Sequence, residues 1–288
     1  MAKSIWFDQI SSCPRRHCPT RRLFLLRSCS CLRLWKHRSH KHVTNLAYFV
    51  YWIHGFKSVS LCLVFSSRIF LLGPSHHYYT PRCALSTATV YKTPIGDLPV
   101  DVEMIKEIRA MGKFEMMDLR VDEAEHSMEM HLPYLAKVFQ GHNVKVVPIL
   151  VGSVSAASEA MYGELLARYV DDPKNFFSVS SDFCHWGSRF NYVRYDKSHG
   201  PIHKSIEALD QMGMDIIETG DPDAFKKYLL EFDNTICGRH PISIFLHMLK
   251  HCSSKIKINF LRYEQSSQCQ TMRDSSVSYA SAAAKLES

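Results

Sequence analysis

Apolar and polar positions follow two recurring patterns along most of this chain. Continuous apolar runs bounded by turn residues predict strands buried on both faces, as in a sheet covered by helices. These strands are predicted at residues 68–72, 143–151 and 175–181, with shorter or alternating ones at 89–91, 255–263 and 275–280. Apolar residues spaced three or four positions apart predict helices at residues 100–111, 154–170, 202–217, 221–232 and 242–249. We therefore predict a single α/β domain with a central mixed sheet covered by helices.

The first 66 residues do not follow this pattern. Residues 1–43 are rich in Arg, Ser, Cys and His without helical or strand periodicity, which is typical of an organelle transit peptide or a disordered extension. Asn45–Phe65 is apolar, but ionisable residues interrupt it near the middle, where a bilayer tolerates them least. A membrane-spanning helix is therefore not our preferred interpretation. We predict an atypical segment at 1–66 and the α/β domain at 67–288.

Charge and cysteine content narrow the class of protein. The chain of 288 residues has a formal charge of +7, but residues 1–65 hold eleven lysines and arginines against one acid, so the remainder is close to neutral. This balance gives no reason to expect a nucleic-acid partner. The ten cysteines lack the spacing of a disulfide framework, which indicates reduced thiols inside a cell. A zinc module at Cys13–Cys18 and Cys29–Cys31 is an alternative without proper finger spacing.

Three polar turns carry the candidate chemistry. They are Ser75–His77, Ser181–His185 and Thr235–His240. Function in helix-covered sheets lies at the ends of the strands, so we expect these turns to converge. A fourth polar segment, Asp122–Tyr134, lacks the H-E-x-x-H pattern of a zinc site; it predicts either a solvated helix start or a polar wall of the same pocket.

The residues of the turns allow three kinds of site. His76 and Cys237, with His185 oriented by Asp182, are suitable ligands for a first-row metal. A cysteine–histidine pair would instead make a nucleophile or redox centre. The third alternative is a pocket that binds a peptide or small molecule without reacting with it.

Several ordered motifs resemble the Memo family, named for mediating ErbB-receptor-driven cell motility. They are G-P-S-H-H at 73–77, D-E-x-E-H-S-M-E-M-H-L-P-Y at 122–134, S-S-D-F-C-H-W-G at 180–187, N-T-I-C-G-R-H-P-I at 234–242, Q-S-S-Q-C at 265–269 and D-S-S-V-S-Y-A at 274–280. The resemblance runs from about Ser67 to the C-terminus and is closest to plant members. It implies a fold related to class III extradiol ring-cleaving dioxygenases and a metal site of two histidines and one cysteine, with iron or copper as the metal.

The resemblance assigns site residues by motif. His76 and Cys237 carry over as metal ligands, and Asp182 and His185 carry over as pocket-lining residues. We add their neighbours in the same turns to the predicted pocket, namely His77 and Cys184. The A-P-H-A-G-Y motif that supplies the family's other histidine is absent, and His54 in W-I-H-G-F is only a superficial echo of it. We therefore expect an incomplete metal site, an uncovered sheet edge beside residues 68–72, and an alternative or mispredicted gene product in which residues 1–66 replace the usual first strand and helix.

The resemblance also implies a function. Memo proteins are chiefly cytosolic and nuclear signalling proteins that contact receptor phosphopeptides and the cytoskeleton. We expect a signalling and redox-homeostasis protein with a vestigial dioxygenase-like site, a phosphopeptide or signalling-protein partner, and a cytoplasmic or nuclear location unless the N-terminus directs it to an organelle. One alternative is an active iron- or copper-dependent oxidoreductase or dioxygenase. Another is a truncated product without function.

Overall fold

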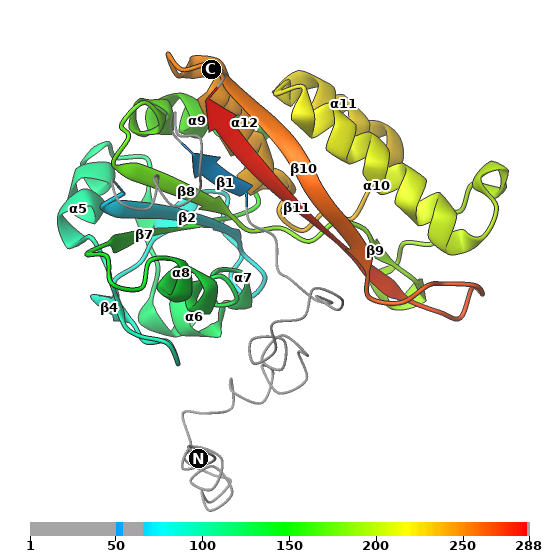
Figure 1. Cartoon of the computed structure of the whole chain (residues 1–288), viewed down its shortest axis with the longest axis horizontal. Helices are drawn as coiled ribbons and strands as arrows, with labels where there is room; N and C mark the ends of the chain where they lie inside the picture. Colours follow the sequence, from blue (N-terminus) through cyan, green and yellow to red (C-terminus); the bar gives the residue numbers. More distant parts are fainter. Residues whose placement is uncertain (1–49, 54–65, 287–288) are drawn as a thin grey trace, which may run out of the picture. The chain divides into compact units, whose positions relative to one another are not determined.

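The computed structural model describes residues 50–53 and 66–286 (Figure 1). Contacts divide the chain into a unit of residues 1–46 and a unit of residues 47–288. The first unit lies outside the described residues, and so do the transit-peptide and zinc-module hypotheses that fall on it. Among the helices of the described part, none is long and apolar enough to cross a membrane.

Five strands of the described part form the main sheet, in the order β6-β3-β7-β2-β8. They are β2 (Arg68–Pro74), β3 (Cys83–Leu85), β6 (Glu115–Met116), β7 (Lys145–Val151) and β8 (Asn175–Val179). β2 runs parallel to both β7 and β8, whereas β3 runs antiparallel to β7, so the sheet is mixed. The predicted α/β fold with a mixed sheet is confirmed.

The predicted edge beside residues 68–72 is wrong. β7 pairs with one side of β2 and β8 with the other, and residues 69–72 are fully buried. The three continuous apolar runs therefore pair with one another, and the run at 68–72 lies between the other two. The short strand predicted at 89–91 is confirmed as β4 (Val90–Tyr91), which pairs with β5 (Leu98–Pro99) in a separate two-stranded sheet. The three residues of β3 give too short a signal to detect.

Helices cover the main sheet on both sides (Figure 1). The helical elements are α5 (Val102–Ala110), α6 (Leu119–Ala124), α7 (His126–Glu129), α8 (Leu132–Val138), α9 (Ala156–Val170), α10 (Ile202–Glu218), α11 (Pro222–Phe232) and α12 (Arg239–His251), with 3-10 turns at Ser188–Phe190 and Lys197–His199. Asp221 caps α11, as its sequence predicts. α12 begins at Arg239 rather than Ile242, because a proline is tolerated in the first turn, where its missing N–H has no helical partner.

A long hairpin packs beside the main sheet and reaches the candidate site. It consists of β10 (Ile256–Gln265) and β11 (Ser276–Leu286), with β1 (Val50–Ile53) parallel to β11 and β9 (His185–Trp186) antiparallel to it. The backbone N–H of Phe183 donates to Ser278 over 2.9 Å, and the N–H of Ser278 donates to Cys184 over 2.9 Å. The hairpin thus fixes the backbone of the turn after β8.

Candidate functional site

The end of β2 is held against α7 by close packing. A Cβ on Gly73 would lie 2.6 Å from the side chain of Met128, so only glycine allows this approach. The hydroxyl of Ser127 donates to the carbonyl of Pro74 over 2.8 Å. The start of α7 and the turn that carries His76 and His77 are therefore neighbours.

Glu125 joins these two segments through a buried carboxylate. As the N-cap of α7, it accepts hydrogen bonds from the N–H of Ser127 at 2.9 Å, the N–H of His76 at 2.7 Å and Nδ1 of His76 at 2.9 Å. Burial by itself raises the pKa of Glu125, but the hydrogen bonds from His76 and Ser127 outweigh it and lower the pKa to about 2. Glu125 is therefore ionised and fixes the orientation of the His76 ring.

Two further imidazoles lie beside His76. Its ring centroid is 4.4 Å from that of His126, and the His77 centroid is 5.9 Å from His126. Burial and the nearby His76 lower the pKa of His126. The segment Asp122–Tyr134 thus begins a helix and also provides a polar wall, so both interpretations from the sequence apply to it.

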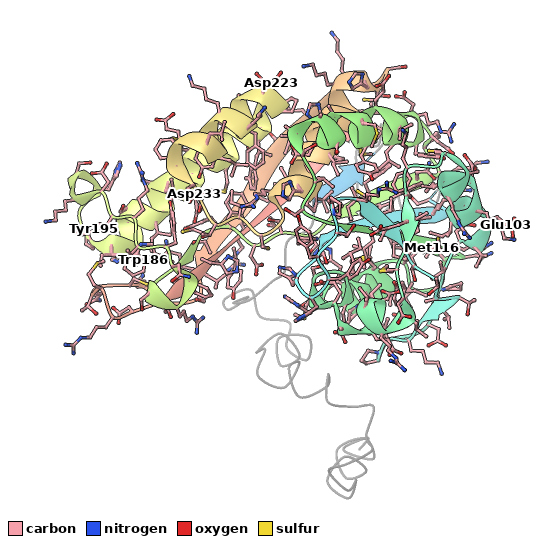
Figure 2. All side chains as sticks on the ribbon, turned by 180° about the vertical axis from the view of Figure 1, so that it is seen from behind. Glu103, Met116, Trp186, Tyr195, Asp223 and Asp233 are labelled. Carbon is pink, nitrogen blue, oxygen red and sulfur yellow. The ribbon has the colours of Figure 1, made fainter. Side chains whose placement is uncertain are left out.

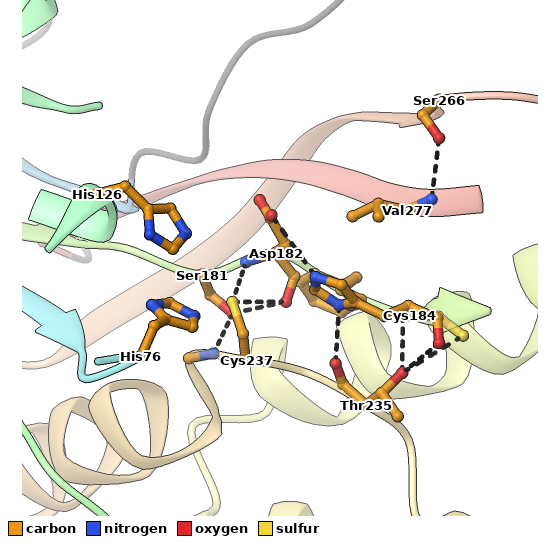
Figure 3. Close-up of polar contacts among 12 residues, drawn as sticks. His76, His126, Ser181, Asp182, Cys184, Thr235, Cys237, Ser266 and Val277 are labelled. Carbon is orange, nitrogen blue, oxygen red and sulfur yellow. Dashed lines mark hydrogen bonds and ion pairs between the residues drawn. The ribbon is translucent and has the colours of Figure 1, made fainter. Parts of the chain in front are cut away.

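The turns after β8 and before α12 are in direct contact (Figure 3). The N–H of Asp182 donates to Sγ of Cys237 over 3.0 Å, and the N–H of Gly238 donates to the hydroxyl of Ser181 over 3.0 Å. Burial and the Asp182 charge raise the pKa of Cys237 to about 12. Burial also raises the pKa of Asp182, while His185 and His76 oppose the rise.

His185 is held in one orientation by Thr235. Its backbone N–H donates to Oγ1 of Thr235 over 2.7 Å, and its ring Nδ1 lies 3.0 Å from the backbone carbonyls of Phe183 and of Thr235. Because both neighbours of Nδ1 are acceptors, Nδ1 carries the proton. The other nitrogen, Nε2, lies 3.9 Å from Oδ2 of Asp182.

Cys184 does not share this pocket. Its side chain is fully buried, with Sγ 4.0 Å from Oγ1 of Thr235, and its N–H donates to Asp210 over 3.3 Å. Burial and the Asp210 charge raise the pKa of its thiol. Of the predicted residues, His76, Asp182, His185 and Cys237 lie together, His77 lies beside them, and Cys184 faces the core.

Comparison with known proteins places these motifs in a family. Residues 54–283 match the Memo family, described as Memo-like protein. The chain belongs to the Memo family. It is 50% identical over 235 residues to Protein MEMO1 of Danio rerio and 49% identical to Protein MEMO1 of Homo sapiens, covering 80% of this chain and 78% of each relative. It is 45% identical over 233 residues to Protein memo-1 homolog of Caenorhabditis elegans, covering 79% of this chain and 66% of that relative.

The donor atoms of this Memo site suit iron or copper. Imidazole nitrogen and thiolate sulfur bind both metals, and a carboxylate can complete the set. The high pKa of Cys237 applies to the free thiol, since a bound metal displaces the proton. Glu125 and Thr235, which orient the histidines, are not predicted as site residues from the sequence. The sequence indicates a helix start or a polar wall for the segment of Glu125 without singling out this residue, and Thr235 carries no separate signal.

A hollow in this Memo chain lies beside the third polar turn and is lined in part by His240. It is a cavity of about 300 Å³ between α9, α11 and α12, and its lining includes no predicted site residue. Glu159 accepts from Nδ1 of His240 at 2.6 Å and from the hydroxyl of Ser243 at 2.8 Å. These contacts tie α9 to α12, so we interpret the group as structural.

Proposed function

We propose that this chain is a metal-binding Memo protein of signalling and redox homeostasis, with iron or copper held by His76 and Cys237. The observation that carries the proposal is the meeting of three turns that are distant in sequence. The Asp182 N–H contacts Cys237, and Figure 3 shows His76 in the same close-up as these two residues. This meeting of imidazole, thiol and carboxylate groups supports a metal site. A thiolate ligand favours redox metal chemistry over ring cleavage, since non-haem iron oxygenases use two histidines and a carboxylate.

The surrounding residues have distinct roles in this proposal. Glu125 accepts from Nδ1 of His76, which leaves Nε2 of that ring for a ligand bond. The backbone N–H of Asp182 donates to the Cys237 sulfur. Nε2 of His185 faces the Asp182 carboxylate, so these two groups can hold a proton between them. When bound, iron or copper supplies one-electron chemistry.

The signalling part of the proposal rests on family membership. The partner is a phosphopeptide or another signalling protein, the location is cytoplasmic and nuclear, and the process is cell motility through the cytoskeleton. Near His185, Arg189 lies over the ring of Phe190 at 4.4 Å, and that ring lies edge-on to His185 at 5.2 Å. An arginine stacked on an aromatic ring beside the pocket supports recognition of an anionic group.

Metal titration of the full chain tests the metal site. Anaerobic Fe(II) and Cu(I), in competition with chromophoric chelators, should bind the unmodified chain, and His76→Ala or Cys237→Ser should abolish binding. Cys252→Ser is the matched control, because its thiol lies just after the end of α12, bonds the carbonyls of Leu249 and Ser254, and belongs to none of the three polar turns. A chain that binds neither metal would contradict the proposal and favour a product without function.

Oxygen consumption tests the competing class of active enzyme. The same pocket holds Asp182 and His185 as possible acid–base groups, which is the observation in favour of an iron- or copper-dependent oxidoreductase. We expect no turnover of catechols and no sustained oxygen consumption with reduced copper. Turnover that His76→Ala and Cys237→Ser both abolish would establish the enzyme instead.

A further inference from the structure

The buried carboxylate of Glu125 faces two histidine rings rather than one. Its Oε1 lies 2.9 Å from Nδ1 of His76 and 3.5 Å from Nδ1 of His126, and its side chain is 1% exposed. The same oxygen accepts the N–H of Ser127. The fixed Glu125 carboxylate therefore faces the Nδ1 edge of both rings.

Because Glu125 faces the Nδ1 edges, the opposite Nε2 edges of both rings are available to bind a metal. A metal-binding histidine usually donates one ring N–H to a carboxylate and binds the metal through the other nitrogen. His76 meets this condition at hydrogen-bonding distance, and His126 is within a short ring rotation of it. The His76 side chain is 28% exposed and that of His126 is 51% exposed, so both rings have access to a ligand.

The spacing of the rings is also compatible with one metal ion. Their centroids are 4.4 Å apart, and one donor atom from each of His76, Glu125 and His126 lies within 4.8 Å of the others. Metal–nitrogen bonds of about 2 Å place two ligands of one ion roughly 3–3.5 Å apart, so shared binding requires the more exposed His126 ring to rotate toward His76. Figure 3 shows the rings of His76 and His126 one above the other, in the same view as Cys237.

Two simpler roles account less well for this arrangement. As a solvated first residue of a helix, His126 would have no reason to stack against another imidazole above a shared anion. As a ligand itself, Glu125 would have to give up N–H bonds from the backbone of His76 and Ser127. These bonds make Glu125 a positioning residue.

We infer that His126 is a further protein ligand of the metal site, and that Glu125 positions His126 and His76 together. The inference rests on the proposed function, because it adds a donor to the site of His76 and Cys237. Within the described residues the ligand set becomes two imidazoles and one thiolate. His126 then supplies the second histidine that the sequence leaves without a candidate in the described part of the chain.

Cobalt(II) is a suitable probe for the full chain, because thiolate binding and imidazole count give separate signals. We expect a sulfur-to-cobalt charge-transfer band in the unmodified chain and two imidazoles by X-ray absorption. His126→Ala should keep the band, lose one imidazole and weaken cobalt binding at least tenfold. Glu125→Gln should keep both signals and weaken binding about 10- to 100-fold. His142→Ala is the matched control, since His142 is exposed on a loop.

The outcomes separate this inference from the proposed function. If His126→Ala keeps full affinity and both imidazoles while Cys237→Ser loses the band, the inference is overturned and the proposed function stands. If the unmodified chain does not bind cobalt, iron or copper, both fail. Thermal unfolding of each metal-free variant checks the fold, and His126→Gln provides a second variant that retains a polar side chain at the helix start.

Discussion

The backbone N–H of Asp182 points at Sγ of Cys237 over 3.0 Å, which joins two turns 55 residues apart. A second bond runs beside it, from the N–H of Gly238 to the hydroxyl of Ser181. The sulfur is therefore placed by backbone groups at the end of β8. Substitutions that move the backbone of either turn should change the free energy of unfolding and the position of the Cys237 sulfur.

Gly238→Ala should separate these two turns. The new Cβ would lie 2.4 Å from the carbonyl oxygen of Ser180 and 2.4 Å from Cβ of Ser181, neither of which can turn aside. Overpacking of this kind costs about 1–3 kcal/mol, so we expect urea denaturation to show a free energy of unfolding lower by that amount. Metal affinity should fall with it. At Gly96 a Cβ meets nothing within 4 Å, so Gly96→Ala is the control, and equal stability of the two variants would contradict the prediction.

Thr235→Val should loosen the backbone that positions the His185 ring while keeping the size of the side chain. The hydroxyl of Thr235 accepts from the backbone N–H of His185 at 2.7 Å and donates to the backbone carbonyl of His185 at 3.0 Å. Valine leaves both groups unsatisfied, at a cost of about 1–3 kcal/mol. Nitrogen-15 NMR of the histidine side chains should show one tautomer, with the proton on Nδ1, in the unmodified chain and a mixture in the variant.

The control for this substitution is Thr87→Val. Thr87 is exposed, and its hydroxyl makes one bond, to the carbonyl of Met117 over 3.2 Å. We expect its effect on unfolding to stay near 0.5 kcal/mol and the His185 spectrum to be unchanged. An unaltered His185 tautomer in Thr235→Val would show that the carbonyl contacts of Nδ1 are sufficient by themselves.

Much of the fold can be predicted from the sequence, because the central strands and long helices have strong periodic signals. The runs at 68–72, 143–151 and 175–181 predict buried strands, and they form the adjacent strands β7, β2 and β8 of the main sheet, with β2 between the other two. The strand β3 cannot be found in this way, since three residues show no periodicity. Pairing is also not predictable from one strand alone, and for this reason the expected edge beside β2 was wrong.

The site is predictable only where chemistry and turn position coincide. Reactive side chains lie beside predicted strand or helix ends at His76, Asp182 and Cys237. The apolar pattern and the side-chain chemistry therefore indicate the same positions. The sequence indicates a helix start at Glu125. Its second role, accepting from Nδ1 of His76, depends on where His76 lies in space and cannot be predicted. Cys184 follows Asp182 by two positions but faces the core, because the β9–β11 pairing sets the backbone of that turn.

Asp210 should make stability depend on pH between about 4 and 6. It is fully buried, and burial raises its pKa from 3.8 to about 6 although Ser278, Asn234 and Tyr263 stabilise its charge. The folded chain therefore holds the proton more tightly than the unfolded chain. The folded state is favoured below the unfolded pKa, and this advantage is lost as pH rises through the folded pKa. A difference of about two pH units corresponds to roughly 3 kcal/mol.

Asp210→Asn should remove this dependence, because the amide stays neutral at every pH. The difference in unfolding free energy between the variant and the unmodified chain should grow by roughly 3 kcal/mol in the variant's favour from pH 4 to pH 7. The amide can be accommodated, since the Tyr263 hydroxyl has another acceptor in Ser278 at 3.1 Å. Asp215→Asn, at an exposed position of the same helix, is the control and should give a flat difference. A flat difference for Asp210→Asn as well would mean that its hydrogen bonds keep the carboxylate ionised at its ordinary pKa.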